Sequence, residues 1–194
     1  MRALLLAVGL GGAIPAGPVP AQDLSGDPAA GRQVAGTCRT CHGLEGLAQV
    51  PIAPHIGGEP AGYLARQLLA FKAGEREHEM MSVVAASLSE RQIADVAAWY
   101  ASQAAHPVLP EGFDAAAAPE LCSGCHGADG IALIEDAPNL AGENRVYLET
   151  QLKAFRDGAR AHEVMSPIAA ELTSTEITAL AEWYASVGIE IEAP

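Results

Sequence analysis

The sequence predicts an all-α fold of two tandem domains, from an internal repeat, from helical periodicity and from the lack of strand patterns. Cys38–Ser102 aligns without a gap on Cys122–Ser186, at a constant offset of 84 positions. About 31 of the 65 aligned pairs are identical, which indicates an internal duplication. No stretch alternates apolar and polar residues for long enough to predict a sheet. Each half is therefore expected to form one helical domain.

Several helices are indicated by their ends as well as by their periodicity. Ser89-x-x-Gln92 and Thr173-x-x-Glu176 are capping boxes, and each precedes an apolar stripe at helical spacing. The other expected helices are Asp27–Thr37, Tyr63–Ala73, Asp114–Leu121 and Tyr147–Asp157. A glycine stands at the end of the second and the fourth of these segments, where a left-handed residue commonly terminates a helix.

Two Cys-x-x-Cys-His pentads use all 4 cysteines of the chain. This spacing is typical of covalent c-type haem attachment, because the two thiols can form thioethers to one porphyrin and the adjacent imidazole can reach its iron. A dithiol redox pair or one shared zinc site are the alternatives, but zinc ribbons separate their cysteine pairs by about 15–20 residues. The expected attachment residues are Cys38, Cys41 and His42 in the first half and Cys122, Cys125 and His126 in the second.

The first residues of the chain predict export. Residues 1–21 combine a short basic start, an apolar run and the small-residue sequence Val19-Pro20-Ala21, so a signal peptide cleaved before Gln22 is expected. Haem is attached in bacteria on the exporting side of the membrane, so the mature protein is expected in the periplasm. No transmembrane segment is predicted, because no stretch approaches about 20 apolar residues. The predicted division is signal peptide 1–21, N-terminal domain 22–102, linker 103–112 and C-terminal domain 113–194.

The charge of the chain is strongly and unevenly negative. The net charge is −13 at pH 7, which argues against nucleic acid as a partner. Residues 22–106 carry 9 acidic and 6 basic residues, a net charge of −3, whereas residues 107–194 carry 15 acidic and 4 basic residues, a net charge of −11. The acidic half is either ordinary solvated surface or a docking face for a basic partner.

The order of these motifs resembles class I c-type cytochromes and, over most of the chain after residue 21, the two-domain dihaem cytochromes of the c4 type. The resemblance implies two tandem class I cytochrome c domains, each wrapped around one covalent haem c. It also implies that the carbonyls of Pro54 and Pro138 accept hydrogen bonds from the proximal imidazoles of His42 and His126, which orients each ring and raises its basicity. Ile56 replaces the leucine that this family has in the first of these loops.

Two methionines are the candidate sixth ligands of the haem irons. Only Met81 and Met165 pair with each other at the repeat offset of 84, whereas Met80 faces Val164. A thioether ligand favours ferrous iron and closes the iron to outside ligands. The expected metal ligands are therefore His42 with Met81 and His126 with Met165, although buried methionines that only fill gaps are an alternative.

Other paired residues have more than one interpretation. His78 and His162 also pair at the repeat offset, and ligation by them would lower both reduction potentials; otherwise they are expected to bond loop backbone or lie near the haem edge. Arg76 and Arg160 either neutralise a haem propionate or are solvated. His55 faces an asparagine in the repeat and is expected at the surface.

Two closed haem irons leave no place for a substrate, so the sequence predicts an electron carrier with no catalytic residues. Each haem would carry one electron between periplasmic or membrane-bound redox proteins, which are expected to have a basic docking face. The alternative is the electron-accepting cytochrome subunit of a periplasmic dehydrogenase, such as a flavocytochrome c sulfide dehydrogenase. A dihaem peroxidase or a gas sensor needs an iron that can open, and the paired methionines argue against both.

Overall fold

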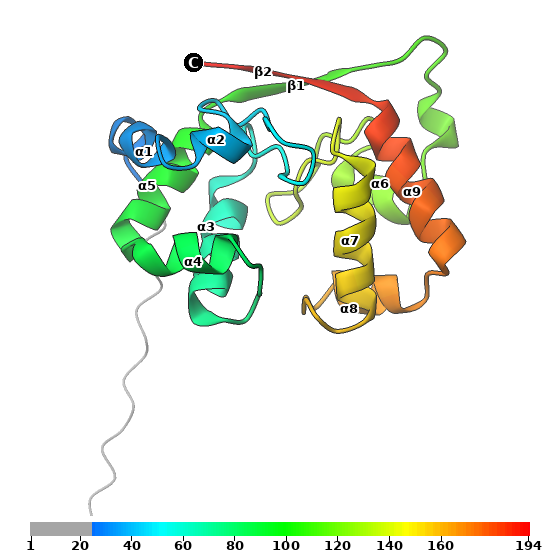
Figure 1. Cartoon of the computed structure of the whole chain (residues 1–194). Helices are drawn as coiled ribbons and strands as arrows, with labels where there is room; N and C mark the ends of the chain where they lie inside the picture. The colour runs from blue at the N-terminus through cyan, green and yellow to red at the C-terminus, as the bar shows by residue number, and fades with distance from the viewer. Residues whose placement is uncertain (1–24) are drawn as a thin grey trace, which may run out of the picture.

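The computed structural model describes residues 25–194, which form two helical domains side by side (Figure 1). The expected signal peptide and its cleavage site lie outside these residues. The N-terminal domain contains α1 (Pro28–Ala35), α2 (Arg39–His42), α3 (Ala61–Ala73), α4 (Met81–Ser87) and α5 (Glu90–Ala101). The C-terminal domain contains the short 3-10 helix η1 (Ala115–Ala117), α6 (Glu120–His126), α7 (Arg145–Arg156), α8 (Met165–Ala170) and α9 (Ser174–Ser186). The helices of this part of the chain are too short or too polar to cross a bilayer.

The helix ends follow the sequence signals in most places. Both capping boxes form: the side chains of Ser89 and Thr173 each accept the N3 backbone N–H, and the N3 side chain bonds back. Gly74 ends α3 with a φ of 75°, in the left-handed region that favours glycine. The expected helix Asp114–Leu121 is wrong as a single element, because Ala118 precedes Pro119 and is held extended with a ψ of 146°.

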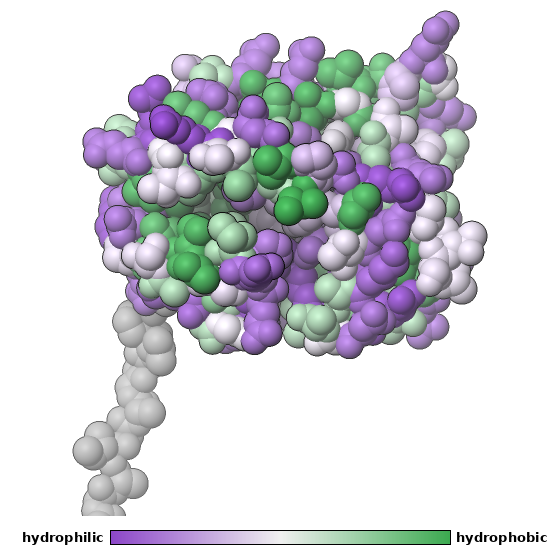
Figure 2. Space-filling view, in the orientation of Figure 1, coloured by the Kyte–Doolittle hydropathy of each residue, from purple (hydrophilic) through white to green (hydrophobic). Residues whose placement is uncertain are grey.

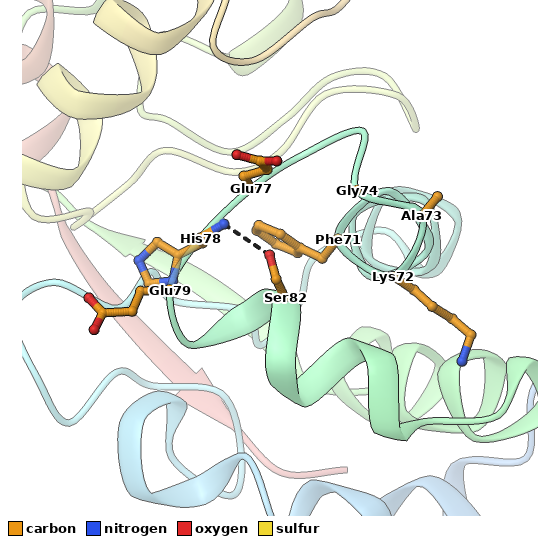
Figure 3. A pocket seen from close by; sticks show the side chains of 8 residues that line it. All are labelled: Phe71, Lys72, Ala73, Gly74, Glu77, His78, Glu79 and Ser82. Carbon is orange, nitrogen blue, oxygen red and sulfur yellow. Dashed lines mark hydrogen bonds between the residues drawn. The ribbon is translucent and has the colours of Figure 1, made fainter.

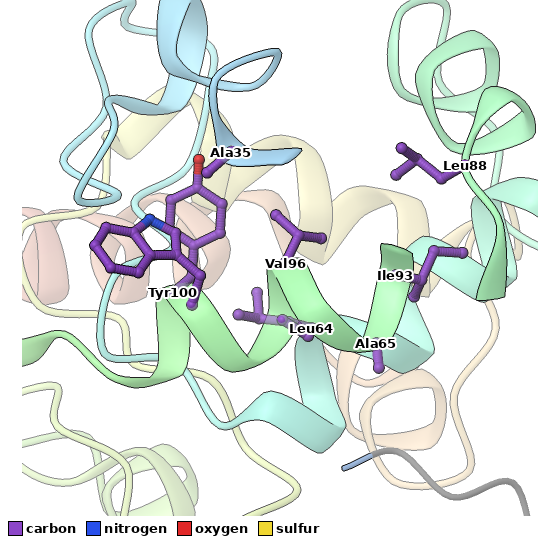
Figure 4. Close-up of a cluster of buried hydrophobic side chains, with 9 residues drawn as sticks. Ala35, Leu64, Ala65, Leu88, Ile93, Val96 and Tyr100 are labelled. Carbon is purple, nitrogen blue, oxygen red and sulfur yellow. The ribbon is translucent and has the colours of Figure 1, made fainter. Parts of the chain in front are cut away.

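The last helix of each domain anchors the segment that follows the haem pentad. The indole N–H of Trp99 donates to the Leu44 carbonyl over 2.7 Å, and the Tyr100 hydroxyl donates to the Gly43 carbonyl over 3.1 Å. Trp183 and Tyr184 make the corresponding bonds in the C-terminal domain. Helix α5 supplies five residues of a buried apolar cluster, and the other members come from the rest of the N-terminal domain (Figure 4). The cluster consists of Ala35, Leu64, Ala65, Leu88, Ile93, Val96, Ala97, Trp99 and Tyr100. The pentads are therefore fixed against the hydrophobic cores.

The two domains are joined by a strand pair that the sequence analysis did not predict. Strand β1 (Ala104–Val108) lies in the expected linker and pairs antiparallel with β2 (Gly188–Glu192), from Ala104 opposite Glu192 to Val108 opposite Gly188. β1 continues from α5 and β2 from α9, so the pair runs across both domains (Figure 1). The sequence of β2 does alternate, but for only 5 residues.

The strand pair also packs on the loops that follow the pentads. A Cβ atom placed on Gly57 would lie 2.6 Å from Cγ2 of Ile191, and one on Gly142 would lie 2.7 Å from Cγ2 of Ile189. Only glycine allows the isoleucines of β2 to approach these loops so closely. The C-terminal tail therefore contacts the loop that follows the pentad in each domain, residues 43–60 and 127–144, which we call the haem loops.

Candidate haem sites and the domain interface

Each pentad histidine is held by one ring nitrogen and keeps the other available. Nδ1 of His42 lies 2.9 Å from the Pro54 carbonyl oxygen, and Nδ1 of His126 lies 2.8 Å from that of Pro138. A carbonyl oxygen only accepts, so Nδ1 carries the proton and Nε2 presents its lone pair. Burial lowers the pKa of both histidines, which keeps each imidazole neutral. A neutral, oriented imidazole is the form that binds a metal.

The cysteines complete a donor set that fits haem c. None of the 4 forms a disulfide bond with another. Burial raises the pKa of the Cys38 and Cys122 thiols, which favours the uncharged thiol before haem is attached. Each pentad therefore offers two thiols for thioether bonds and one imidazole lone pair for the iron, on a short helix that ends at the histidine.

The paired methionines start the helices α4 and α8. Met81 and Met165 are half-buried, whereas Met80 is 62% exposed. Nδ1 of His78 lies 3.3 Å from the backbone nitrogens of both Met80 and Met81 and accepts from their N–H groups. His162 holds the start of α8 in the same way over 3.2 Å. The histidines thus bond loop backbone, one of the two roles expected for them, and fix the backbone that carries the methionines.

An open hollow of about 730 Å³ lies between the end of α3 and the start of α4 (Figure 3). It is lined by Phe71, Lys72, Ala73, Gly74, Glu77, His78, Glu79 and Ser82. At its wall the backbone N–H of His78 donates to Oγ of Ser82 over 3.1 Å. No pentad residue and neither paired methionine lines it, so it is distinct from the haem donor set.

His55 does not lie at a free surface as expected but joins the two domains. Its Nδ1 accepts the backbone N–H of Ala48 over 3.0 Å, so Nε2 carries the proton and donates to the Gly142 carbonyl over 3.1 Å. Asn139, its partner in the repeat, does the same: Oδ1 accepts the N–H of Ala132 over 2.9 Å and Nδ2 donates to the Gly58 carbonyl over 3.0 Å. Two different side chains therefore make the same pair of contacts in opposite directions.

Two arginines form a second reciprocal contact, so the solvated alternative for them is wrong. Arg76 donates over 2.7 Å to Gln67 of its own domain and over 2.7 Å to Gln151 of the other. Arg160 donates over 2.7 Å to Gln151 and over 2.8 Å to Gln67. Each guanidinium also lies over a phenylalanine of its own domain, with the carbon at 4.5 Å and 4.4 Å from the ring centre. Neutralisation of a haem propionate by these arginines stays a prediction.

Sequence reasoning missed the interface itself. Gln67 and Gln151 were visible only as an identical pair in the repeat, as were the buried carboxyls Glu59 and Glu143. Identity of polar residues at the repeat offset was the available signal. It does not by itself distinguish a contact within each domain from a contact between domains.

Comparison with known proteins identifies the family. Residues 111–183 match the family of cytochrome c oxidase, cbb3-type, subunit III. The chain is 32% identical to cytochrome c4 of Pseudomonas aeruginosa, over 93% of this chain and 94% of that protein. The chain belongs to the cytochrome c4 family. The crystal structure of reduced cytochrome c4 from Pseudomonas stutzeri matches with a TM-score of 0.73 and 27% identity, covering 84% of this chain and all of that one (100%).

As a member of this family, the chain has two class I cytochrome c domains, carries two covalently bound haem c groups and is an electron-transfer protein. The haem iron supplies the chemistry, a one-electron change between ferrous and ferric states. Each pentad would hold one porphyrin, and the proline carbonyl orients the imidazole that would bind its iron. A further relative, the thiosulfate dehydrogenase electron acceptor of Thiomonas intermedia, is 33% identical over 78% of this chain and 79% of that protein.

The equivalent hydrogen bonds of His55 and Asn139 predict which substitution His55 tolerates. His55→Asn should retain both contacts and change the free energy of unfolding little, because Asn139 makes the equivalent two hydrogen bonds in the C-terminal domain. His55→Leu should cost about 1–3 kcal/mol, because it leaves the Ala48 N–H and the Gly142 carbonyl without their partner. Urea unfolding of the haem-loaded protein, followed by circular dichroism, measures both. Equal destabilisation by the two variants would contradict this assignment.

Proposed function

We propose that this cytochrome passes single electrons between periplasmic redox proteins and catalyses no reaction of its own. The observation that carries this proposal is the pairing of each oriented proximal histidine with a methionine at the same repeat offset, which would close both faces of each iron. A six-coordinate haem has no open position for a substrate. Ligation by one histidine and one methionine also raises the reduction potential relative to two histidines.

The ligand sets that we propose are His42 with Met81 and His126 with Met165. Met81→Ala should abolish the sulfur-to-iron charge-transfer band of one haem and let its ferrous form bind carbon monoxide. Met80→Ala is the matched control and should change neither, because Met80 is exposed and has no methionine partner in the repeat. Absorbance spectra with and without carbon monoxide measure both variants. Ready binding of carbon monoxide by the wild type would exclude the closed-site carrier.

We also propose that residues 1–21 are removed on export to the periplasm. The support is the apolar segment before Val19-Pro20-Ala21 together with the pentads, whose haem is attached on the exporting side of the membrane. The mature protein should then begin at Gln22 and carry the mass of two haems. Intact-protein mass spectrometry tests this, and a retained Met1 would contradict it.

We propose that a basic partner docks on the exposed acidic surface of the C-terminal domain. Glu120 and Glu135 are exposed there, and they replace Gly36 and Pro51 of the other half. Asp136 is less suitable as a docking group, because it pairs with Arg66 of the N-terminal domain over 2.8 Å. Exposed apolar residues lie in both haem loops, Ile52 at 71% and Leu133 at 68%, and Figure 2 shows apolar patches among hydrophilic side chains on one face. An apolar contact surrounded by negative charge suits a basic redox partner.

Electron transfer with a basic cytochrome or copper protein should therefore slow as ionic strength rises. Changing Glu120 and Glu135 to Lys together should lower the second-order rate constant by roughly tenfold at low salt, because it removes electrostatic steering. The control changes Glu75 and Glu77, exposed acids of the N-terminal domain, to Lys. Stopped-flow kinetics measures the rates. Equal effects of the two double variants would remove the docking role of the C-terminal domain.

A second candidate function is that of electron acceptor for a sulfur-compound dehydrogenase, favoured by the similarity to the thiosulfate dehydrogenase electron acceptor. This role uses the same haems but requires a lasting complex with one enzyme. A stable complex with such a dehydrogenase in gel filtration at physiological salt supports it. Rapid exchange with several carriers and no stable complex supports the free carrier.

A further inference from the structure

Two buried carboxyls face the domain interface from opposite sides. Glu59 is 3% exposed and Glu143 is 4% exposed, and they occupy equivalent positions in the repeat. Neither forms an ion pair with a basic side chain among residues 25–194. Buried carboxyls without a cation are costly, so their retention in both halves needs a physical reason.

The contact made by Glu59 supplies that reason. Its Oε2 accepts the backbone N–H of Asn139, in the other domain, over 3.0 Å. This N–H belongs to the peptide group whose carbonyl is that of Pro138, and the Pro138 carbonyl accepts Nδ1–H of His126 over 2.8 Å. One peptide group therefore connects a carboxyl of the N-terminal domain to the proximal histidine of the C-terminal domain.

The equivalent peptide of the N-terminal domain, between Pro54 and His55, lies beside Glu143 of the other domain. The Pro54 carbonyl accepts Nδ1–H of His42 over 2.9 Å, and the N–H of the same peptide is that of His55. Burial raises the pKa of Glu143 to about 8, and the backbone N–H groups of His55 and Asn144 offset part of that rise. Among residues 25–194, Oε2 of Glu143 has no hydrogen-bond partner, so the Glu143 carboxyl is fixed by fewer contacts than that of Glu59.

We propose that Glu59 and Glu143 are positioning residues that each lower the reduction potential of the haem in the opposite domain. A carboxyl that accepts from a peptide N–H polarises the peptide and makes its carbonyl a stronger acceptor. The stronger acceptor draws the imidazole proton and raises the basicity of Nε2, which favours ferric iron. The proposal rests on the ligation by His42 and His126, and it makes the potential of each haem depend on the docking of the two domains.

The charge state of the carboxyls adds a pH dependence with a definite sign. Burial raises the pKa of Glu59 well above its usual range, and the nearby Glu143 raises it further against the lowering effect of the Asn139 N–H. Asn139 and Glu143 are the groups that face Glu59, whereas His55, Asn144 and Tyr147 face Glu143. Ionisation of a carboxyl at alkaline pH makes it a stronger hydrogen-bond acceptor and polarises the peptide further. The reduction potentials of the haems should therefore fall as pH rises.

The test is a redox titration of the haem-loaded protein that resolves the two haems. Glu59→Leu removes the acceptor and should raise the potential of the haem on Cys122 and Cys125, with a roughly threefold change in its reduction equilibrium, about 28 mV for one electron. Glu59→Gln keeps an acceptor and should restore the wild-type value at pH 6. Glu143→Leu is the matched control and should move the other haem, the one on Cys38 and Cys41.

Two results would overturn the proposal. One is an equal shift of both haems in each variant, since that is the effect of a general charge and not of a peptide contact. The other is unchanged potentials in variants whose spectra still show the sulfur-to-iron band, which would leave the ligand assignment intact. If Glu59→Leu does not fold, Glu59→Gln decides, because it should abolish the alkaline fall in potential of the opposite haem only.

Discussion

The hydrogen bond from each proximal histidine to a proline carbonyl is the contact on which the rest of this structure depends. It joins residues 12 positions apart, so it requires the loop between them to be rigid. The last helix of each domain fixes the start of that loop through a tryptophan and a tyrosine. The other domain and the strand pair fix its end. The fold is therefore built around the orientation of two imidazole rings.

The main contacts between the domains come in pairs, each made by equivalent residues of the two halves of the repeat. The arginines bond the same two glutamines, His55 and Asn139 exchange contacts with the opposite glycine carbonyls, and both carboxyls face an opposing haem loop. Most of these contacts join buried or half-buried polar groups, and satisfied polar groups of this kind fix one arrangement more strictly than apolar contact does. The only ion pair across the interface, among the described residues, joins Arg66 and Asp136, which are largely exposed and contribute little to stability. Electron transfer between the haems would benefit from such a fixed geometry.

The sequence was sufficient for whatever depends on local chemistry. The pentads, the capping boxes and the glycine that ends α3 each follow from neighbouring residues, and all could be predicted. The strand pair could not, because β1 is an ordinary linker sequence that becomes a strand only beside the C-terminal tail. His55 was misjudged for the same reason. Its partner carbonyl is 87 residues away, and a change from histidine to asparagine in the repeat does not look like a shared role until the two hydrogen bonds are compared.

Amide hydrogen exchange at Asn139 tests most directly whether each haem loop is held across the domain interface. The measurement is NMR of the reduced, haem-loaded protein. The bond to Glu59 predicts that the Asn139 N–H exchanges as slowly as the core amides of α5, through global unfolding. Exchange as fast as that of an exposed loop residue such as Glu111 would contradict the account, because the loop would then be free of the other domain.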